Sequence, residues 1–248
     1  METLNLCTPS LPVFNLMFST IYLLGYFIIF RNWKQNLRPE ASSCLVSLAH
    51  GTPAVLLSLY SILYPQTQLN FASPNTNFQN MVLDYSIAYF FMDLLHYMIF
   101  IPSDVLFIAH HLATLYVFLT CRYIVHHGGS AILVLLVLAE VTSACQNTWS
   151  FARFRKADVP VAAKVYERLS PVFYAFYSVV RGVLGPLFVY KMGLFYANGG
   201  ADGVIPRWAW ISWMAVIVSA ILVSILWVIN LWIDLYRERT KKEERKSS

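Results

Sequence analysis

The chain has 248 residues, of which 58% are apolar, 16% are aromatic and only 12% are charged. This composition excludes an ordinary soluble domain and predicts an all-α, polytopic membrane protein. The net charge of +5 does not indicate a nucleic-acid partner, because the basic residues gather in the loops beside apolar segments, where membrane insertion puts them.

Seven segments approach the roughly 20 apolar residues that a membrane-spanning helix needs. In chain order they are Leu11–Phe30, Ala41–Tyr64, Met81–Ile101, Asp104–Ile124, Ser130–Phe151, Pro171–Tyr196 and Trp208–Asp234. No basic residue precedes the first segment and no small-residue cleavage site follows it, so we interpret it as a retained helix rather than a signal peptide.

The basic residues also predict the orientation of the chain. With seven spans, fourteen of the 18 Lys and Arg residues fall on one side of the membrane and three on the other, while Arg181 stays inside a span. By the positive-inside rule, the C-terminus is cytosolic and the N-terminus lumenal. Cys7 and Cys121 then lie near the lumenal face, where an oxidising compartment permits a disulfide.

Six ionisable residues lie within the predicted spans, although charge in hydrocarbon costs several kcal/mol. They are Asp93, His96, His110, His111, Glu140 and Arg181. At a rise of about 1.5 Å per residue, the aspartate and the histidines fall in the cytosolic half of the membrane, and Glu140 and Arg181 fall near its midplane. Four helices therefore contribute to one polar layer.

Polar side chains in these four helices also recur at helical spacing, so that each helix presents one polar face. The faces comprise Tyr85, Tyr89, Asp93 and His96; His110 and Thr114; Glu140, Ser143 and Asn147; and Tyr174, Tyr177, Ser178 and Arg181. Such faces predict a shared interior cavity. We expect its lining to include Tyr89, Thr114, Glu140, Ser143, Asn147, Tyr177 and Arg181.

Three motifs carry a resemblance to a known family. They are Asp93-Leu-Leu-His96-Tyr97 with Ala109-His110-His111-Leu112-Ala113-Thr114, Glu140-Val-Thr-Ser-Ala-Cys-Gln-Asn147, and Arg181-x-x-x-Gly185-Pro186. They resemble the TLC-domain family, which includes the ceramide synthases, and the second motif is similar to that of its non-synthase branch. The resemblance implies a six-helix bundle around a lipid-binding cavity, with one extra N-terminal helix, in the endoplasmic reticulum or a related endomembrane.

On this basis the chain divides into an N-terminal helix and cytosolic loop (1–37), a TLC-type domain (38–236) and a cytosolic basic tail (237–248). The tail has Lys246 third from its end, which resembles a dibasic retrieval signal for coat machinery. In ceramide synthases the second motif is His-Asp-x-x-Asp-x-x-Leu-Glu. Here Ala139, Ser143 and Asn147 replace its first His, second Asp and Glu, which argues against ceramide synthase activity.

Several functions stay open at this point. The first is binding or sensing of a long-chain acyl or sphingoid-type lipid in membrane lipid homeostasis. The second is an acyltransferase that uses acyl-CoA as co-substrate, with His110 or His111 as base or nucleophile and with Asp93 and His96 orienting the base. A third is a cargo-sorting or scaffold protein that works through its tail and loops.

A purely structural reading of the polar layer also stays open, in which Arg181 neutralises Glu140 or Asp93. We expect no cofactor and no metal, because the six histidines are too few for the His-rich boxes of membrane di-iron enzymes. His126 and His127 lie in a lumenal loop. His50 precedes Gly51 and Pro53, so we expect it at a helix distortion rather than as a ligand.

Overall fold

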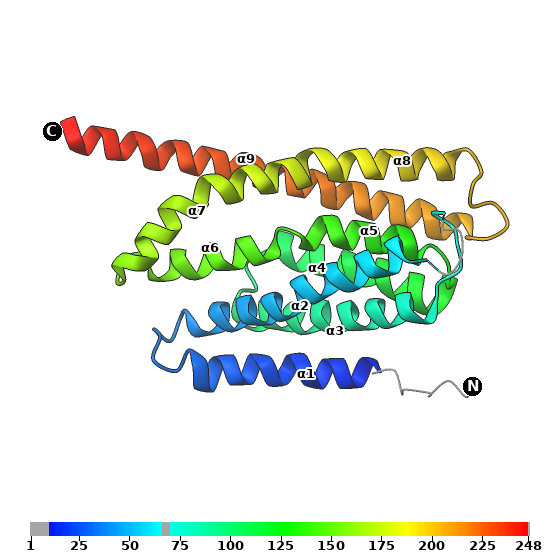
Figure 1. Cartoon of the computed structure of the whole chain (residues 1–248), viewed down its shortest axis with the longest axis horizontal. Helices are drawn as coiled ribbons and strands as arrows, with labels where there is room; N and C mark the ends of the chain where they lie inside the picture. The colour runs from blue at the N-terminus through cyan, green and yellow to red at the C-terminus, as the bar shows by residue number, and fades with distance from the viewer. Residues whose placement is uncertain (1–9, 66–69, 248) are drawn as a thin grey trace.

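The computed structural model describes residues 10–65 and 70–247, and in these residues the chain is built of helices (Figure 1). The elements are α1 (Leu11–Leu24), η1 (Gly25–Ile29), α2 (Arg38–Leu63), α3 (Asn77–Phe100), α4 (Val105–Leu119), η2 (Thr120–Val125), α5 (Gly129–Glu140), α6 (Ser143–Arg155), α7 (Pro160–Val179), η3 (Val180–Leu184), α8 (Gly185–Ala197) and α9 (Arg207–Ser247), where η marks a π-helical turn. The predicted all-α, polytopic fold is confirmed.

Within the described residues, six helical segments are long and apolar enough to cross a membrane. They are Leu11–Ile29, Arg38–Leu63, Val105–Val125, Gly129–Arg155, Pro160–Ala197 and Arg207–Arg237. A seventh long helix, α3, lies third in chain order. It has 24 residues and is less apolar because it carries Asp84, Asp93 and His96. A less apolar helix is tolerated where its polar groups face the interior of a bundle.

Three of the predicted segments differ from the observed helices. The predicted span at 130–151 is interrupted at Val141 and Thr142, between α5 and α6. The predicted span that begins at Pro171 instead begins at Pro160, the first residue of α7. Proline is well accommodated in a first turn, and the polar residues after Pro160 continue the helix. The last helix continues through the tail to Ser247.

Side-chain caps fix where two of the site helices begin. Thr76 and Gln79 form a capping box at the start of α3, in which each side chain accepts a hydrogen bond from the other residue's backbone N–H. The Asp104 carboxylate accepts from the Phe107 backbone N–H at 3.2 Å and caps α4. Both caps help to hold the register of the helices that carry Asp93 and His111.

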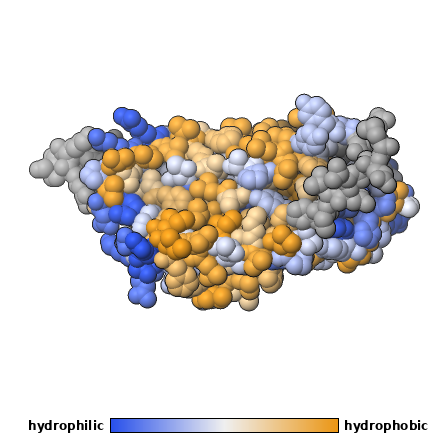
Figure 2. Space-filling model, turned by 60° about the horizontal axis from the view of Figure 1, so that its bottom comes forward, coloured by the Kyte–Doolittle hydropathy of each residue, from blue (hydrophilic) through white to orange (hydrophobic). Residues whose placement is uncertain are grey.

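The helices run along one long axis, with α1 on one side of the bundle and α8 and α9 on the other (Figure 1). Apolar side chains cover the middle of the molecule, and hydrophilic side chains gather at its ends (Figure 2). Large apolar side chains on the bundle surface, such as Leu16, Leu63 and Ile99, are 67 to 70% exposed. This belt is the surface that a lipid bilayer covers.

One end of the bundle, which we call the basic end, contains the loop after η1 and the turn between α6 and α7. The two meet through Lys34, whose Nζ lies 3.3 Å from an Asp158 carboxylate oxygen. The Arg155 guanidinium lies over the Trp33 ring at 5.0 Å. These loops carry much of the positive charge that the positive-inside rule predicts for the cytosolic side.

The opposite end of the bundle is covered by the loop that precedes α3. The Asn75 side chain donates to the Cys121 carbonyl at 3.1 Å and accepts from the Gly129 backbone N–H at 2.7 Å. The Ser130 hydroxyl donates to the Asn70 carbonyl at 2.7 Å. Cys121 is a free cysteine, and the predicted partner Cys7 lies outside the described residues.

Candidate functional site

A cavity of about 280 Å³ lies among the helices, and we call it the polar compartment. Its wall comes mainly from α2, α3, α4 and α6, with single contributions from α5, α7, η3 and α9. It contains ten of the predicted site residues: Tyr89, Asp93, His96, His110, His111, Glu140, Ser143, Asn147, Tyr177 and Arg181. Sequence spacing therefore identified residues that the fold gathers around one space.

A second cavity, of about 120 Å³, adjoins the first, and we call it the apolar compartment. It lies between α4, α5, η3 and α9, and its wall includes the remaining predicted residue, Thr114. Phe90, His110, Glu140 and Arg181 line both compartments. These four residues form the boundary between a polar and an apolar space. That any of these residues binds a ligand or reacts stays a prediction.

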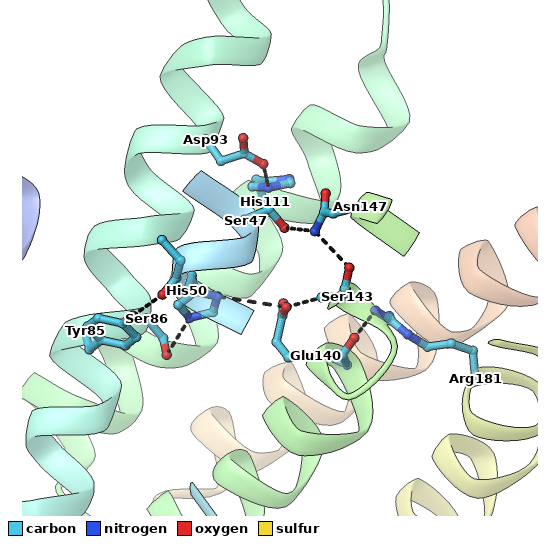
Figure 3. Close-up of polar contacts among 12 residues, drawn as sticks. Ser47, His50, Tyr85, Ser86, Asp93, His111, Glu140, Ser143, Asn147 and Arg181 are labelled. Carbon is cyan, nitrogen blue, oxygen red and sulfur yellow. Dashed lines mark hydrogen bonds and ion pairs between the residues drawn. The ribbon is translucent and has the colours of Figure 1, made fainter. Parts of the chain in front are cut away.

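Asp93 and His111 form the central pair of the polar compartment (Figure 3). His111 Nε2 lies 2.9 Å from Asp93 Oδ2, and both side chains are buried. The Ser43 hydroxyl donates to the other oxygen of the carboxylate. Because α3 and α4 supply one partner each, this pair also ties the two helices together.

Both ring nitrogens of His111 are occupied. His111 Nδ1 donates to the Phe107 backbone carbonyl at 2.9 Å, because a carbonyl oxygen only accepts. Its Nε2 is engaged by the Asp93 carboxyl group. Both nitrogens of His111 thus face protein groups, and His111 holds the Asp93 carboxyl group in place. The predicted role of His111 as base or nucleophile stays a prediction.

His110 differs from His111 in this respect. Its Nδ1 is buried and has no hydrogen-bond partner in the described residues. Its ring contacts the rings of His111 and Trp227, with centroids 5.7 and 5.9 Å apart. His110 lies at the boundary between the two compartments, so of the two adjacent histidines it is the one available to a ligand.

His96 receives its partner from the N-terminal helix. The Tyr22 hydroxyl of α1 lies 3.0 Å from His96 Nδ1, and His96 Nε2 is buried without a partner in the described part of the chain. One turn earlier in α1, the fully buried Phe18 packs against the rings of Tyr85 and Tyr89. Sequence reasoning missed Tyr22, although its spacing of four from Phe18 marks a buried face of α1.

Glu140 lies at the end of α5, where the helix is interrupted (Figure 3). The Ser143 hydroxyl donates to its Oε2, and His50 Nδ1 lies 3.9 Å from the same atom. His50 is fully buried, stacks on Tyr89 with ring centroids 4.0 Å apart, and pairs through Nε2 with the Ser86 hydroxyl at 3.1 Å. His50 therefore belongs to the polar layer.

The expectation that His50 marks a helix distortion misses this role, because α2 is helical through Pro53 from Arg38 to Leu63. The missed signal was that Ser43, Ser47 and His50 recur at the spacing of one helix face. Gly51 lies on the same side. A Cβ atom there would lie 2.9 Å from Glu140 Oε2 and 2.9 Å from Ser143 Cβ, so the absence of a side chain allows α2 to approach the α5/α6 interruption.

Arg181 holds the other side of this interruption. Its guanidinium donates to the Ala139 backbone carbonyl in the last turn of α5, where a cation is favourable. Its Nε is buried without a partner among the described atoms. Among the described residues Arg181 forms no ion pair within 4.0 Å of Glu140 or Asp93. The structural interpretation of the polar layer, in which Arg181 neutralises one of these carboxylates, stays a prediction.

Asn147 connects α6 to α2. Its amide donates to the Ser47 hydroxyl and to the Ser143 carbonyl, each at 2.9 Å. The described residues contain no group of three or more His, Cys, Asp or Glu side chains that could hold a metal ion. The side chains gathered at the site offer hydrogen bonding and proton transfer, and the absence of a metal or cofactor stays a prediction.

The helical bundle and its buried Asp–His pair define a polytopic membrane protein with a candidate site among its helices. Residues 40–233 match the family model described as the TLC domain, and the chain belongs to this family. It is similar to the TLC domain-containing protein At5g14285 of Arabidopsis thaliana, with 62% identity over 239 residues that cover 96% of this chain and 94% of that protein. No solved structure matches the chain. The predicted family membership is confirmed.

Proposed function

We propose that this protein binds one long-chain amphiphilic lipid, of acyl or sphingoid type, and serves membrane lipid homeostasis in the endoplasmic reticulum or a related endomembrane. The observation that carries the proposal is the shared wall of the two compartments. Phe90, His110, Glu140 and Arg181 line both, so a polar space and an apolar space adjoin as the two parts of an amphiphile do.

Unsatisfied polar atoms support a polar head group in the polar compartment. His96 Nε2, His110 Nδ1 and Arg181 Nε are buried without a partner in the described residues. Most buried polar groups in proteins are hydrogen-bonded, and each one left unpaired costs about 1–3 kcal/mol. A head group that carries a carbonyl or hydroxyl oxygen supplies the acceptor that Arg181 Nε lacks.

The position of the polar compartment supports access from the basic end. Its wall includes Glu40 in the first turn of α2, and Arg153 and Phe154 in the last turn of α6. Arg153 lies over the Trp149 ring at 5.1 Å, which keeps its charge beside the compartment. We propose that this end faces the cytosol, with the N-terminus in the lumen, in agreement with the positive-inside rule.

An acyltransferase is the second candidate, and the free Nδ1 of His110 at the compartment boundary favours it. In this reaction an acceptor hydroxyl or amine attacks the thioester carbonyl of acyl-CoA. His110 takes the proton of the acceptor and returns it to the departing CoA thiolate. Both nitrogens of His111 are engaged, so in this reaction its part is to hold the Asp93 carboxyl group in place.

Analysis of co-purified lipid tests the proposed function. The full-length protein, with Arg181→Leu and Arg207→Leu variants, is purified in mild detergent, and the extracted lipids are compared with those of the source membrane by mass spectrometry. Arg207 is an exposed residue at the start of α9, so its variant controls for the loss of a cation. We expect one lipid class to be enriched with the wild type and the control and to be lost with Arg181→Leu. Lipid of bulk composition in every sample would refute the proposal.

A turnover assay separates the second candidate. Purified protein is incubated with labelled acyl-CoA and a set of amine and hydroxyl acceptors. A product that His110→Ala abolishes supports the acyltransferase. Enriched lipid without any histidine-dependent product supports binding alone.

A further inference from the structure

The apolar compartment has one polar end and one apolar end. His110, Glu140 and Arg181 lie at the end shared with the polar compartment. Phe118 and Ile132 also line the wall, each eight positions along its helix from His110 or Glu140. At a rise of about 1.5 Å per residue, both lie roughly 12 Å from the polar end. Helices α4 and α5 run in opposite directions, and both give the same distance between the two ends of the apolar compartment.

Helix α9 gives a similar depth. Ser224 and Ile217 line the same wall seven positions apart, which corresponds to roughly 10 Å. Because α9 runs antiparallel to α4, Ile217 lies beside the far end and Ser224 beside the polar end. The apolar compartment thus has a consistent axis along the bundle.

Buried side chains pack beyond the far end of the compartment. Trp213 is fully buried, and its Nε1 donates to the Thr120 hydroxyl at 2.8 Å. Ile132 is 1% exposed. Packed interiors leave few voids and resist displacement, so the compartment does not lengthen without a cost.

We propose that the apolar compartment binds the hydrocarbon chain of the ligand and that Ile132 and Ile217 set the longest chain that fits. This inference rests on the proposed function. An extended chain that fills one leaflet, half of a hydrocarbon core about 30 Å thick, is longer than the roughly 12 Å available. The end of such a chain meets these two side chains.

The selection is steric. A chain that enters this compartment from a bilayer or a micelle moves from one apolar environment to another, so added methylenes gain little from leaving water. A methylene beyond the packed end instead forces side chains out of place. Binding is therefore expected to vary little among short chains and to fall sharply above one length.

Native mass spectrometry of the full-length protein in detergent tests this. The probes are saturated fatty acids from octanoate to stearate and the corresponding monoacylglycerols, which share the chain and differ in the head group. Ile132→Ala and Ile217→Ala shorten the closing side chains, and we expect each to move the upper length limit to the next longer probe. Ala220→Leu adds bulk inside the compartment and is expected to move the limit to a shorter probe. Ile211 also lies in α9 but is 52% exposed, and we expect Ile211→Ala to leave the length limit unchanged.

The outcomes separate the two proposals. If the wild type binds no probe, this inference fails together with the acyl-type ligand of the proposed function, and the co-purified lipid decides the sphingoid type. If it binds probes with a limit that the three compartment variants leave in place, or with a limit that depends on the head group, this inference fails and the proposed function stands. General loosening of the fold does not imitate the expected result, because Ala220→Leu and Ile217→Ala shift the limit in opposite directions.

Discussion

Replacing Gly51 by alanine tests whether the approach of α2 to the α5/α6 interruption holds the site together. The new Cβ atom would lie 2.9 Å from both Glu140 Oε2 and Ser143 Cβ. Neither atom moves freely. Glu140 Oε2 accepts a hydrogen bond from the Ser143 hydroxyl, and Ser143 Cβ is fixed to the backbone at the start of α6. Relief of the clash therefore requires a shift of the backbone, and overpacking of this kind costs about 1–3 kcal/mol.

The gain in helix propensity partly hides this cost, since alanine is about 1 kcal/mol more favourable than glycine inside a helix. Gly182→Ala provides the control, because a Cβ atom at Gly182 meets nothing within 4 Å. The difference between the two variants isolates the clash. At about 2–4 °C per kcal/mol for a chain of this size, we expect Gly51→Ala to unfold roughly 2–12 °C below Gly182→Ala.

Thermal unfolding of the two purified variants in the same detergent, followed by tryptophan fluorescence, measures this difference. Lipid retention is measured on the same samples, and we expect it to fall only with Gly51→Ala, because Glu140 lies at the compartment boundary. Equal melting temperatures for the two variants would refute the reasoning and show that α5 and α6 yield at their junction without cost.

Three further variants test the buried pairs by the same thermal assay. Asp93→Ala leaves His111 and Ser43 unpaired, and we expect a loss of about 3–5 kcal/mol, whereas Asp93→Asn is expected to be milder because its amide can donate to a neutral His111. A larger loss for Asn than for Ala would contradict the pairing described. Tyr22→Phe removes the hydroxyl that contacts His96 Nδ1, and we expect it to lower the free energy of unfolding by about 1 kcal/mol. We also expect the tautomer of His96 to change in nitrogen NMR spectra. Unchanged spectra would show that the Tyr22 contact does not set the tautomer.

The polar layer could be predicted from the sequence because hydrocarbon excludes charge. Isolated ionisable groups are unfavourable in hydrocarbon, so Asp93, His111 and Glu140 are expected in apolar segments only where they lie near one another. The helical rise per residue gives their depth in the membrane. The structure brings them to one compartment. The pairing inside that layer was not predictable, because depth and helix face do not determine which of two adjacent histidines points at the aspartate.

The interruption of the fifth span was not predictable for a different reason. Residues 130–151 contain neither glycine nor proline, so the local signals of a helix break are missing. Tertiary contacts from other helices lie at the break, namely Gly51 beside Glu140 and the Arg181 guanidinium on the Ala139 carbonyl. His50 was missed because its neighbours Gly51 and Pro53 suggested a bent helix.

The N-terminal helix has a consequence for how fragments of this protein behave. The TLC domain match begins at residue 40, yet α1 supplies the hydroxyl that contacts His96 and the aromatic ring of Phe18 that seals the adjacent wall. A truncated protein that starts at the family boundary would expose a row of aromatic side chains to lipid and leave a histidine without its neighbour. The unit that folds and the unit that family comparison delimits are therefore different lengths of chain.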